Sequence, residues 1–183
     1  MRLFLALDLP AGAREAIGRR RDAVVTGRAD LRPVADEALH VTLVFIGTRP
    51  AEMVERLWRA ASGSLARLSA PTLTARGLEV VPPRRPRVLA LELEDEGGRA
   101  AAVHEALSSA LQGAGLHEPE LRPFWPHVTV ARVRRDAKVR EGAWSPPPAS
   151  IPPFAARRVT LYRSDLHPAG ARYVALERLN LPT

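Results

Sequence analysis

The chain has 183 residues, of which 27 are Lys or Arg and 20 are Asp or Glu, giving a formal net charge of +7. It contains no cysteine, which excludes disulfides, thiolate nucleophiles and cysteine-ligated metal centres. No apolar run approaches the roughly 20 residues that cross a bilayer, and Asp8 and Pro10 interrupt the apolar start, so we expect a cytoplasmic monomer that does not bind membranes.

The excess of basic residues favours an anionic partner such as nucleic acid or a phosphorylated metabolite. All the basic residues except Lys138 are Arg, whose planar fork of donors suits phosphate groups. A basic surface that only reflects a coding bias toward Arg, Ala and Pro explains the same composition equally well. Composition alone therefore leaves the partner open.

Strand and helix patterns alternate along the whole chain. Alternating or β-branched apolar runs predict strands, and apolar residues three and four positions apart predict helices. In chain order we expect a strand at 2–9, a helix at 11–25, a strand at 39–46, a helix starting at Pro50, strands at 72–81 and 87–94, a helix at 98–114, a strand within 126–133, and a closing strand pair at 156–166 and 171–179. Loops rich in Pro or Gly separate several of them, including those at 82–86, 145–153 and 167–170.

This order of elements contains a rough internal duplication. Two strands that carry a His-Val-Thr step each lie near a helix and a pair of strands. No linker in the sequence marks a domain boundary. We therefore expect residues 1–183 to form one α+β domain built from two lobes.

The segments "LHVTLVFIG" and "PHVTVARV" each place a histidine two residues before a threonine in a predicted strand. Side chains at positions i and i+2 of a strand point to the same face. His40 therefore lies beside Thr42, and His127 lies beside Thr129. Because the step recurs in matching halves of the duplicated pattern, a shared site is favoured over two unrelated buried histidines.

Two such His-Thr pairs fit the cleavage of a phosphodiester. With an ordinary pKa near 6.5, one neutral imidazole can accept a proton from water while a protonated one donates to the leaving oxygen. The threonine hydroxyls can stabilise the charge that develops on the non-bridging oxygens. Two histidines without nearby acidic ligands make a poor zinc site, so we expect no metal or other cofactor. The near symmetry of the motifs leaves open which histidine is the acid.

The stretches "RLFLALDLP", "LHVTLVFIG", "PHVTVAR" and "LYRSDLHPAGARYVAL" together resemble the two-histidine (HxTx) phosphoesterases. The resemblance is greatest to the RNA 2′,3′-cyclic phosphodiesterases formerly called 2′-5′ RNA ligases. It implies a bilobal α+β fold, with two antiparallel sheets related by a pseudo-twofold around a central cleft and helices outside. The implied reaction opens the 2′,3′-cyclic phosphates of RNA ends or nucleotides to 2′-phosphomonoesters without a metal, with weak reverse 2′-5′ ligation.

The resemblance also implies roles for individual residues. His40 corresponds to the proton donor to the 3′ oxygen and His127 to the proton acceptor from water, while Thr42 and Thr129 occupy phosphate-binding positions. Arg132 corresponds to a residue that contacts the substrate. In a regular strand, however, Arg132 would face away from His127, so a bulge, a strand end or a long side chain that reaches over the rim would be needed.

Two aromatic residues are further candidates for substrate binding, and each has a structural alternative. Phe4 is expected either to stack a nucleobase or to lie in the core. Trp125 stands where the family often has Arg, so it is expected either to stack a base or to be a rim or core aromatic. We expect His104 at a surface or core boundary, and His117 and His167 on the surface.

Two other functions fit the same residues. One is the hydrolysis of another cyclic or 2′,5′-linked phosphodiester, such as ADP-ribose 1″,2″-cyclic phosphate. The other is a non-catalytic module that binds RNA ends with strong salt dependence. The presence of both His-Thr pairs argues against the second, because binding alone would be better served by Arg.

Overall fold

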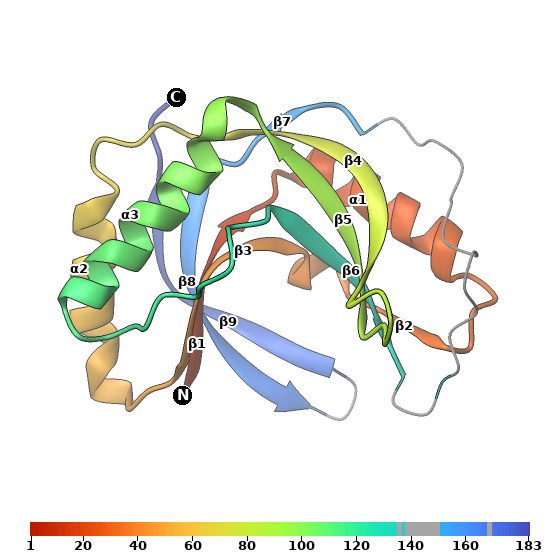
Figure 1. The fold of residues 1–183 in the computed structure, drawn as a ribbon, viewed down its shortest axis with the longest axis horizontal. Helices are drawn as coiled ribbons and strands as arrows, with labels where there is room; N and C mark the ends of the chain where they lie inside the picture. The colour runs from red at the N-terminus through yellow and green to blue at the C-terminus, as the bar shows by residue number, and fades with distance from the viewer. Residues whose placement is uncertain (135–136, 138–150, 168–169) are drawn as a thin grey trace.

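The computed structural model describes residues 1–134, 137, 151–167 and 170–183. Its strands form a strongly curled sheet, and the α-helices lie on the outside (Figure 1). Most of the predicted loop at 145–153 and the middle of the predicted turn at 167–170 fall outside the described residues. Within the described ranges, no helix is both long and apolar enough to span a bilayer.

The observed elements follow the predicted order closely. The strands are β1 (Arg2–Asp8), β2 (Leu31–Pro33), β3 (His40–Thr48), β4 (Thr72–Val81), β5 (Val88–Asp95), β6 (His127–Val133), β7 (Phe154–Ala155), β8 (Arg158–His167) and β9 (Gly170–Asn180). The helices are α1 (Ala11–Val25), α2 (Val54–Ser64) and α3 (Arg99–Gly113), with short 3-10 helices at Asp36–Ala38, Ala51–Met53 and Glu96–Gly98.

The sequence missed β2 and β7. Each has only two or three residues, too few to show a period, and each exists because it pairs with a longer strand: β2 with β6, and β7 with β4. The helix predicted from Pro50 starts later than expected, because the 3-10 turn at Ala51–Met53 comes first.

The described strands form one antiparallel sheet in the order β7-β4-β5-β6-β3-β1-β8-β9, with β2 also paired to β6. It consists of two halves, one ending at β6 and the other at β3. A single registered pair, Val41 opposite Val128, joins them. The two sheets implied by the resemblance are therefore continuous through this one contact, and the two His-Val-Thr strands lie next to each other.

Helices α1 and α3 each pack against the half of the sheet that does not contain the strand preceding them in the chain. Helix α1 follows β1 in the chain but packs on β2 and β6, whereas α3 follows β5 and packs on β3 and α2. One cluster of buried apolar residues runs through both halves, and Leu3, Leu5 and Leu7 of β1 are fully buried within it. The two halves of the sheet therefore share one hydrophobic core.

Strand β6 contains a bulge one residue after its threonine. Strand β5 pairs Ala90 with Thr129 and Leu89 with Ala131, so Val130 has no partner in that ladder. Both Val130 and Ala131 are buried, although consecutive residues of a regular strand would face opposite ways. The strand therefore changes which of its side chains face the cleft beyond this point.

Candidate active site

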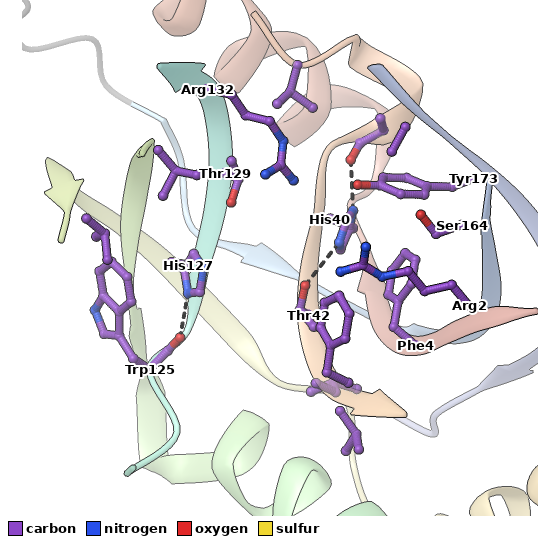
Figure 2. A pocket seen from close by; sticks show the side chains of 18 of the residues that line it. Arg2, Phe4, His40, Thr42, Trp125, His127, Thr129, Arg132, Ser164 and Tyr173 are labelled. Carbon is purple, nitrogen blue, oxygen red and sulfur yellow. Dashed lines mark hydrogen bonds between the residues drawn. The ribbon is translucent and has the colours of Figure 1, made fainter. Parts of the chain in front are cut away.

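The two His-Val-Thr strands present their side chains to a common cleft. Because Val41 lies opposite Val128 in an antiparallel pair, one further step in each direction sets each histidine opposite the other strand's threonine. Figure 2 shows the two pairs facing each other across the opening. The four side chains line one cavity of about 670 Å³: His40, Thr42, His127 and Thr129.

His40 is held by hydrogen bonds at both ring nitrogens. Its Nδ1 donates to the carbonyl of Ala38 at 2.8 Å, and its Nε2 lies 3.1 Å from the Thr42 hydroxyl. Burial lowers the pKa of His40 to about 4, a shift that the charge of Asp8 opposes and the proximity of His127 reinforces. Without a bound anion, His40 is therefore neutral at pH 7.

Trp125 orients His127 through a hydrogen bond and a stacking contact. Its Nδ1 donates to the Trp125 carbonyl at 2.8 Å, and the two rings stack with centroids 4.3 Å apart. The indole N–H in turn donates to Glu92 at 3.1 Å. Burial lowers the pKa of His127, so it is neutral and ready to accept a proton at pH 7.

Trp125 lies in the cleft wall, where one face of its indole already packs against His127. Of the two roles weighed for it, that of a rim aromatic is the one seen in this structure, and a contact with a base stays a prediction. Phe4 has only 2% of its surface exposed. It is buried but also lines the cavity, and its ring centroid lies 4.9 Å from that of His40 and 5.0 Å from that of Tyr173. A contact of Phe4 with a nucleobase therefore stays a prediction.

A buried carboxylate lies behind His40. Asp8 is the register partner of His40 in the β1–β3 pair and accepts hydrogen bonds from Arg158 at 2.6 Å, Thr160 at 3.0 Å and Tyr162 at 2.8 Å. Burial and the hydrogen bond to Asp8 raise the pKa of Tyr162 to about 12, which keeps its hydroxyl a donor. The sequence does not indicate a role for Asp8 or Tyr162, because the β1–β8 pairing brings these distant residues together.

Arg132 reaches the cleft through the bulge at Val130. With one extra residue in β6, its side chain returns to the face that carries His127 and Thr129, and it lines the cavity. Figure 2 shows the guanidinium extending between the two strands. Within the described residues it forms no ion pair, so its charge is available to an anion.

Strand β3 contains a bulge at the same position relative to its His-Val-Thr step, and this bulge was not predicted from the sequence. Its partner β1 pairs with Thr42 and then with Val44, skipping Leu43. Phe45 consequently corresponds to Arg132, and it lines the cavity with 43% of its surface exposed. Aligning "HVTLVF" with "HVTVAR" would have shown this correspondence. The guanidinium of Arg2 lies 5.3 Å from the centre of the Phe45 ring.

The remaining histidines also line the cavity, which the sequence did not predict. His104 donates from Nδ1 to the Leu43 carbonyl at 2.8 Å and stacks on Phe124 at 4.7 Å. Burial lowers the pKa of His117. His167 is an exposed residue, as predicted, at the tip of β8. Among the described residues, no cluster of three or more His, Asp or Glu side chains could hold a metal ion.

The chain is similar to known proteins over nearly its whole length. The family model of the 2′-5′ RNA ligase superfamily matches residues 9–168. The chain belongs to this superfamily. A Thermus thermophilus relative named RNA 2′,3′-cyclic phosphodiesterase is 33% identical over 99% of this chain and 90% of its own. An Escherichia coli relative of the same name is also 33% identical, over 97% of this chain and 94% of its own.

Solved structures show the same architecture. The crystal structure of TT0787 from Thermus thermophilus superposes with a TM-score of 0.78 at 31% identity and covers 99% of this chain and 98% of its own. Escherichia coli LigT complexed with NADP⁺ gives a TM-score of 0.74 at 30% identity and covers 100% and 98%. The predicted two-histidine phosphoesterase fold, of the α+β class with helices outside, is thereby confirmed.

Proposed function

We propose that this member of the 2′-5′ RNA ligase superfamily hydrolyses 2′,3′-cyclic phosphates of RNA ends and nucleotides to 2′-phosphomonoesters. The observation that carries the proposal is that two His-Thr pairs from adjacent antiparallel strands line one cavity, with Arg132 beside them. The full-length relatives named RNA 2′,3′-cyclic phosphodiesterase support the choice of substrate.

In the proposed reaction, His127 is the general base. Its Nδ1 is occupied by the Trp125 carbonyl, so Nε2 takes a proton from a water molecule in the cleft. The water oxygen bonds to phosphorus as the bond from phosphorus to the 3′ oxygen breaks. The products are a 2′-phosphomonoester and a free 3′ hydroxyl.

His40 is the general acid that protonates the departing 3′ oxygen. The assignment comes from the family resemblance, and the asymmetry of the site supports it, because the charge of Asp8 favours the protonated form of His40. Burial favours the neutral form, so binding of the phosphate anion must raise the pKa of His40 before the reaction. Proton donation is thereby coupled to the presence of the substrate.

Thr42, Thr129 and Arg132 line the cavity. In the proposed mechanism they bind the non-bridging oxygens, where negative charge increases in the transition state. These donors supply the electrostatic stabilisation without a metal in the proposed mechanism. The reverse 2′-5′ ligation follows from microscopic reversibility and stays a minor reaction in water.

The test is to incubate the purified protein with 2′,3′-cyclic AMP and with a cyclic-phosphate-ended oligonucleotide, with and without EDTA, and to separate the products by chromatography. We expect a 2′-phosphate in both conditions. His40→Gln and His127→Gln should each lower kcat by about 10²–10⁴-fold, because each removes one proton transfer. Thr42→Val should lower kcat/KM, whereas Thr48→Val, at the exposed end of β3, serves as the matched control.

Several results would contradict the proposal. They are the absence of a 2′-phosphate product, or unchanged turnover when both histidines are replaced. Loss of activity with EDTA would contradict the metal-independent mechanism. A higher kcat/KM for ADP-ribose 1″,2″-cyclic phosphate than for the RNA substrates would indicate that this class of phosphodiester is the preferred substrate. Salt-sensitive RNA binding without turnover would indicate a binding module.

A further inference from the structure

Arg2 is a cationic side chain in the cleft that the proposed mechanism does not use. It stands at the start of β1, the strand paired with β3, and lines the same cavity as His40. Figure 2 shows its guanidinium extending into the opening on the His40 side, whereas Arg132 extends from the opposite strand. Within the described residues, Arg2 forms no ion pair.

The surroundings of Arg2 hold its guanidinium on this wall. Phe45 lies under it at 5.3 Å, and Phe45 is braced by Phe4, whose ring centroid is 6.0 Å away. Ser164 is the register partner of Arg2 across the β1–β8 pair, so both side chains leave the sheet on the same face. Arg2 and Ser164 thus form a pair of hydrogen-bond donors that we call the β1–β8 donor pair.

The lining of the cavity favours an anion there. Glu120 is the one carboxylate among the described residues that line it, and it is 3.6 Å from Arg122. Arginine binds phosphate oxygens through two parallel N–H donors, and a neighbouring hydroxyl can donate to a third position. A phosphate group is the ligand that this pair of donors suits.

The connectivity of RNA indicates which phosphate this is. In the proposed reaction, His40 protonates the 3′ oxygen, so the 3′ carbon of the terminal ribose lies toward the β3 wall. The next ribose atoms are the 4′ and 5′ carbons, and the 5′ oxygen carries the phosphate shared with the preceding nucleotide. The base is attached on the 2′ side of the ring. The upstream phosphate therefore leaves the reacting centre along the wall that Arg2 and Ser164 occupy.

We propose that the β1–β8 donor pair binds the phosphate on the 5′ oxygen of the terminal nucleotide, so that the preferred substrate is a polynucleotide or 5′-phosphorylated end. This inference rests on the proposed function for the orientation of the ribose. It assigns Arg132 and Arg2 to different phosphates: Arg132 to the cyclic phosphate, and Arg2 to the one before it.

The experiment compares substrates that differ only in the 5′ phosphate. The kcat/KM is measured for 2′,3′-cyclic AMP, for its 5′-phosphorylated form, and for the dinucleotide ApA with a 2′,3′-cyclic end. We expect the wild-type protein to prefer the latter two by about tenfold, the effect of one hydrogen bond to a charged group. Arg2→Gln should remove this preference, and Ser164→Ala should reduce it.

The matched control is Arg163→Gln. Arg163 neighbours Ser164 on β8 but does not line the cavity, and it is ion-paired with Asp165 at 2.8 Å. This variant should keep the wild-type ratio between the substrates. Arg132→Gln should lower kcat/KM for all three substrates and keep the ratio too.

A second measurement requires no turnover. Calorimetric titration with adenosine 2′-monophosphate and adenosine 2′,5′-bisphosphate should show about tenfold tighter binding of the bisphosphate, and Arg2→Gln should abolish the difference. Absence of hydrolysis would refute the proposed function, while this titration would still decide the role of Arg2. Equal binding of both ligands to the wild type, or loss of the preference in Arg132→Gln instead of Arg2→Gln, would overturn the inference.

Discussion

His40 combines two properties that oppose each other. As the proposed proton donor it must be protonated, yet burial lowers its pKa to about 4. Asp8, its register partner, acts in the other direction, and hydrogen bonds from Arg158, Thr160 and Tyr162 hold that carboxylate in place. The carboxyl group of Asp8 thus lies on one side of the proposed acid, and the substrate phosphate would lie on the other.

The pH profile tests this function of Asp8. In the proposed mechanism the active form has His40 protonated and His127 neutral. Both pKa values are lowered, so the wild-type optimum of kcat/KM should lie below pH 6.5. Asp8→Asn removes the charge that favours protonated His40. The optimum should then move to lower pH, and kcat/KM at pH 7 should fall by about tenfold, the effect of one unit of pKa.

Tyr162→Phe is the control for this measurement, because it removes one hydrogen bond to Asp8 and leaves the carboxylate in place. Its optimum should stay at the wild-type pH. An Asp8→Asn profile that superposes on the wild-type profile would show that Asp8 has only a structural role.

At the scale of elements, the two bulges decide which side chains face the cleft. Each follows a His-Val-Thr step by one residue, at Leu43 in β3 and at Val130 in β6. The alternation of a regular strand predicts that Arg132 faces away from His127. The bulge reverses that direction, because an extra residue shifts the alternation by one position.

The bulge predicts different effects for two arginines near the end of β6. Arg132→Gln should lower kcat/KM by about 10–100-fold, because a charged donor to the phosphate is lost. Arg134→Gln should have little effect, since Arg134 lies beyond the end of the strand and does not line the cavity. Steady-state kinetics on 2′,3′-cyclic AMP gives both values. Equal losses in the two variants would mean that the general basic charge matters and not the placement of Arg132.

Most element boundaries were predictable to within about two residues, because strand and helix periods are local properties of the chain. Helix α1 and strand β4 match their predicted ranges, and Pro10 precedes α1 as expected, whereas β3 continues through Gly47 to Thr48 instead of ending at Ile46. The short strands β2 and β7 could not be predicted in this way, because they depend on a partner strand that is distant in sequence.

At the scale of the whole molecule, the candidate active site occupies the junction of two halves that share one core. Helices α1 and α3 each cover strands of the other half, and a single registered pair joins β3 to β6. Placing two imidazoles in this junction removes them partly from water, which lowers the pKa of both. The folded protein is therefore less stable at pH values at which these imidazoles would be protonated in the unfolded chain.

The free energy of unfolding should consequently decrease as the pH is lowered from the ordinary pKa of histidine to the folded pKa of His40. The folded pKa of His40 is about 4, against 6.5 as the ordinary value, so between these values the unfolded chain binds a proton that the folded chain does not. Lowering the pH from 7 to 4.5 should decrease the free energy of unfolding of the wild-type protein by on the order of 2–3 kcal/mol more than that of the His40→Gln variant. Urea unfolding at the two pH values measures this difference.

His167→Gln is the matched control, because His167 is exposed at the end of β8. It should lose the same stability as the wild type over this range. If His40→Gln also loses as much as the wild type, the burial of the imidazole is too weak to disfavour its protonation.

The sequence by itself determined the element order, the two His-Thr pairs and the face of each strand on which they lie, because these follow from local periodicity. The tertiary structure alone decided that the two pairs meet, that Arg132 reaches the cleft, that Phe4 is buried, and that Asp8 lies behind His40. Each of these depends on strand register or on a bulge. Register is set by packing between segments distant in the chain, and a shift of one residue turns a side chain to the opposite face.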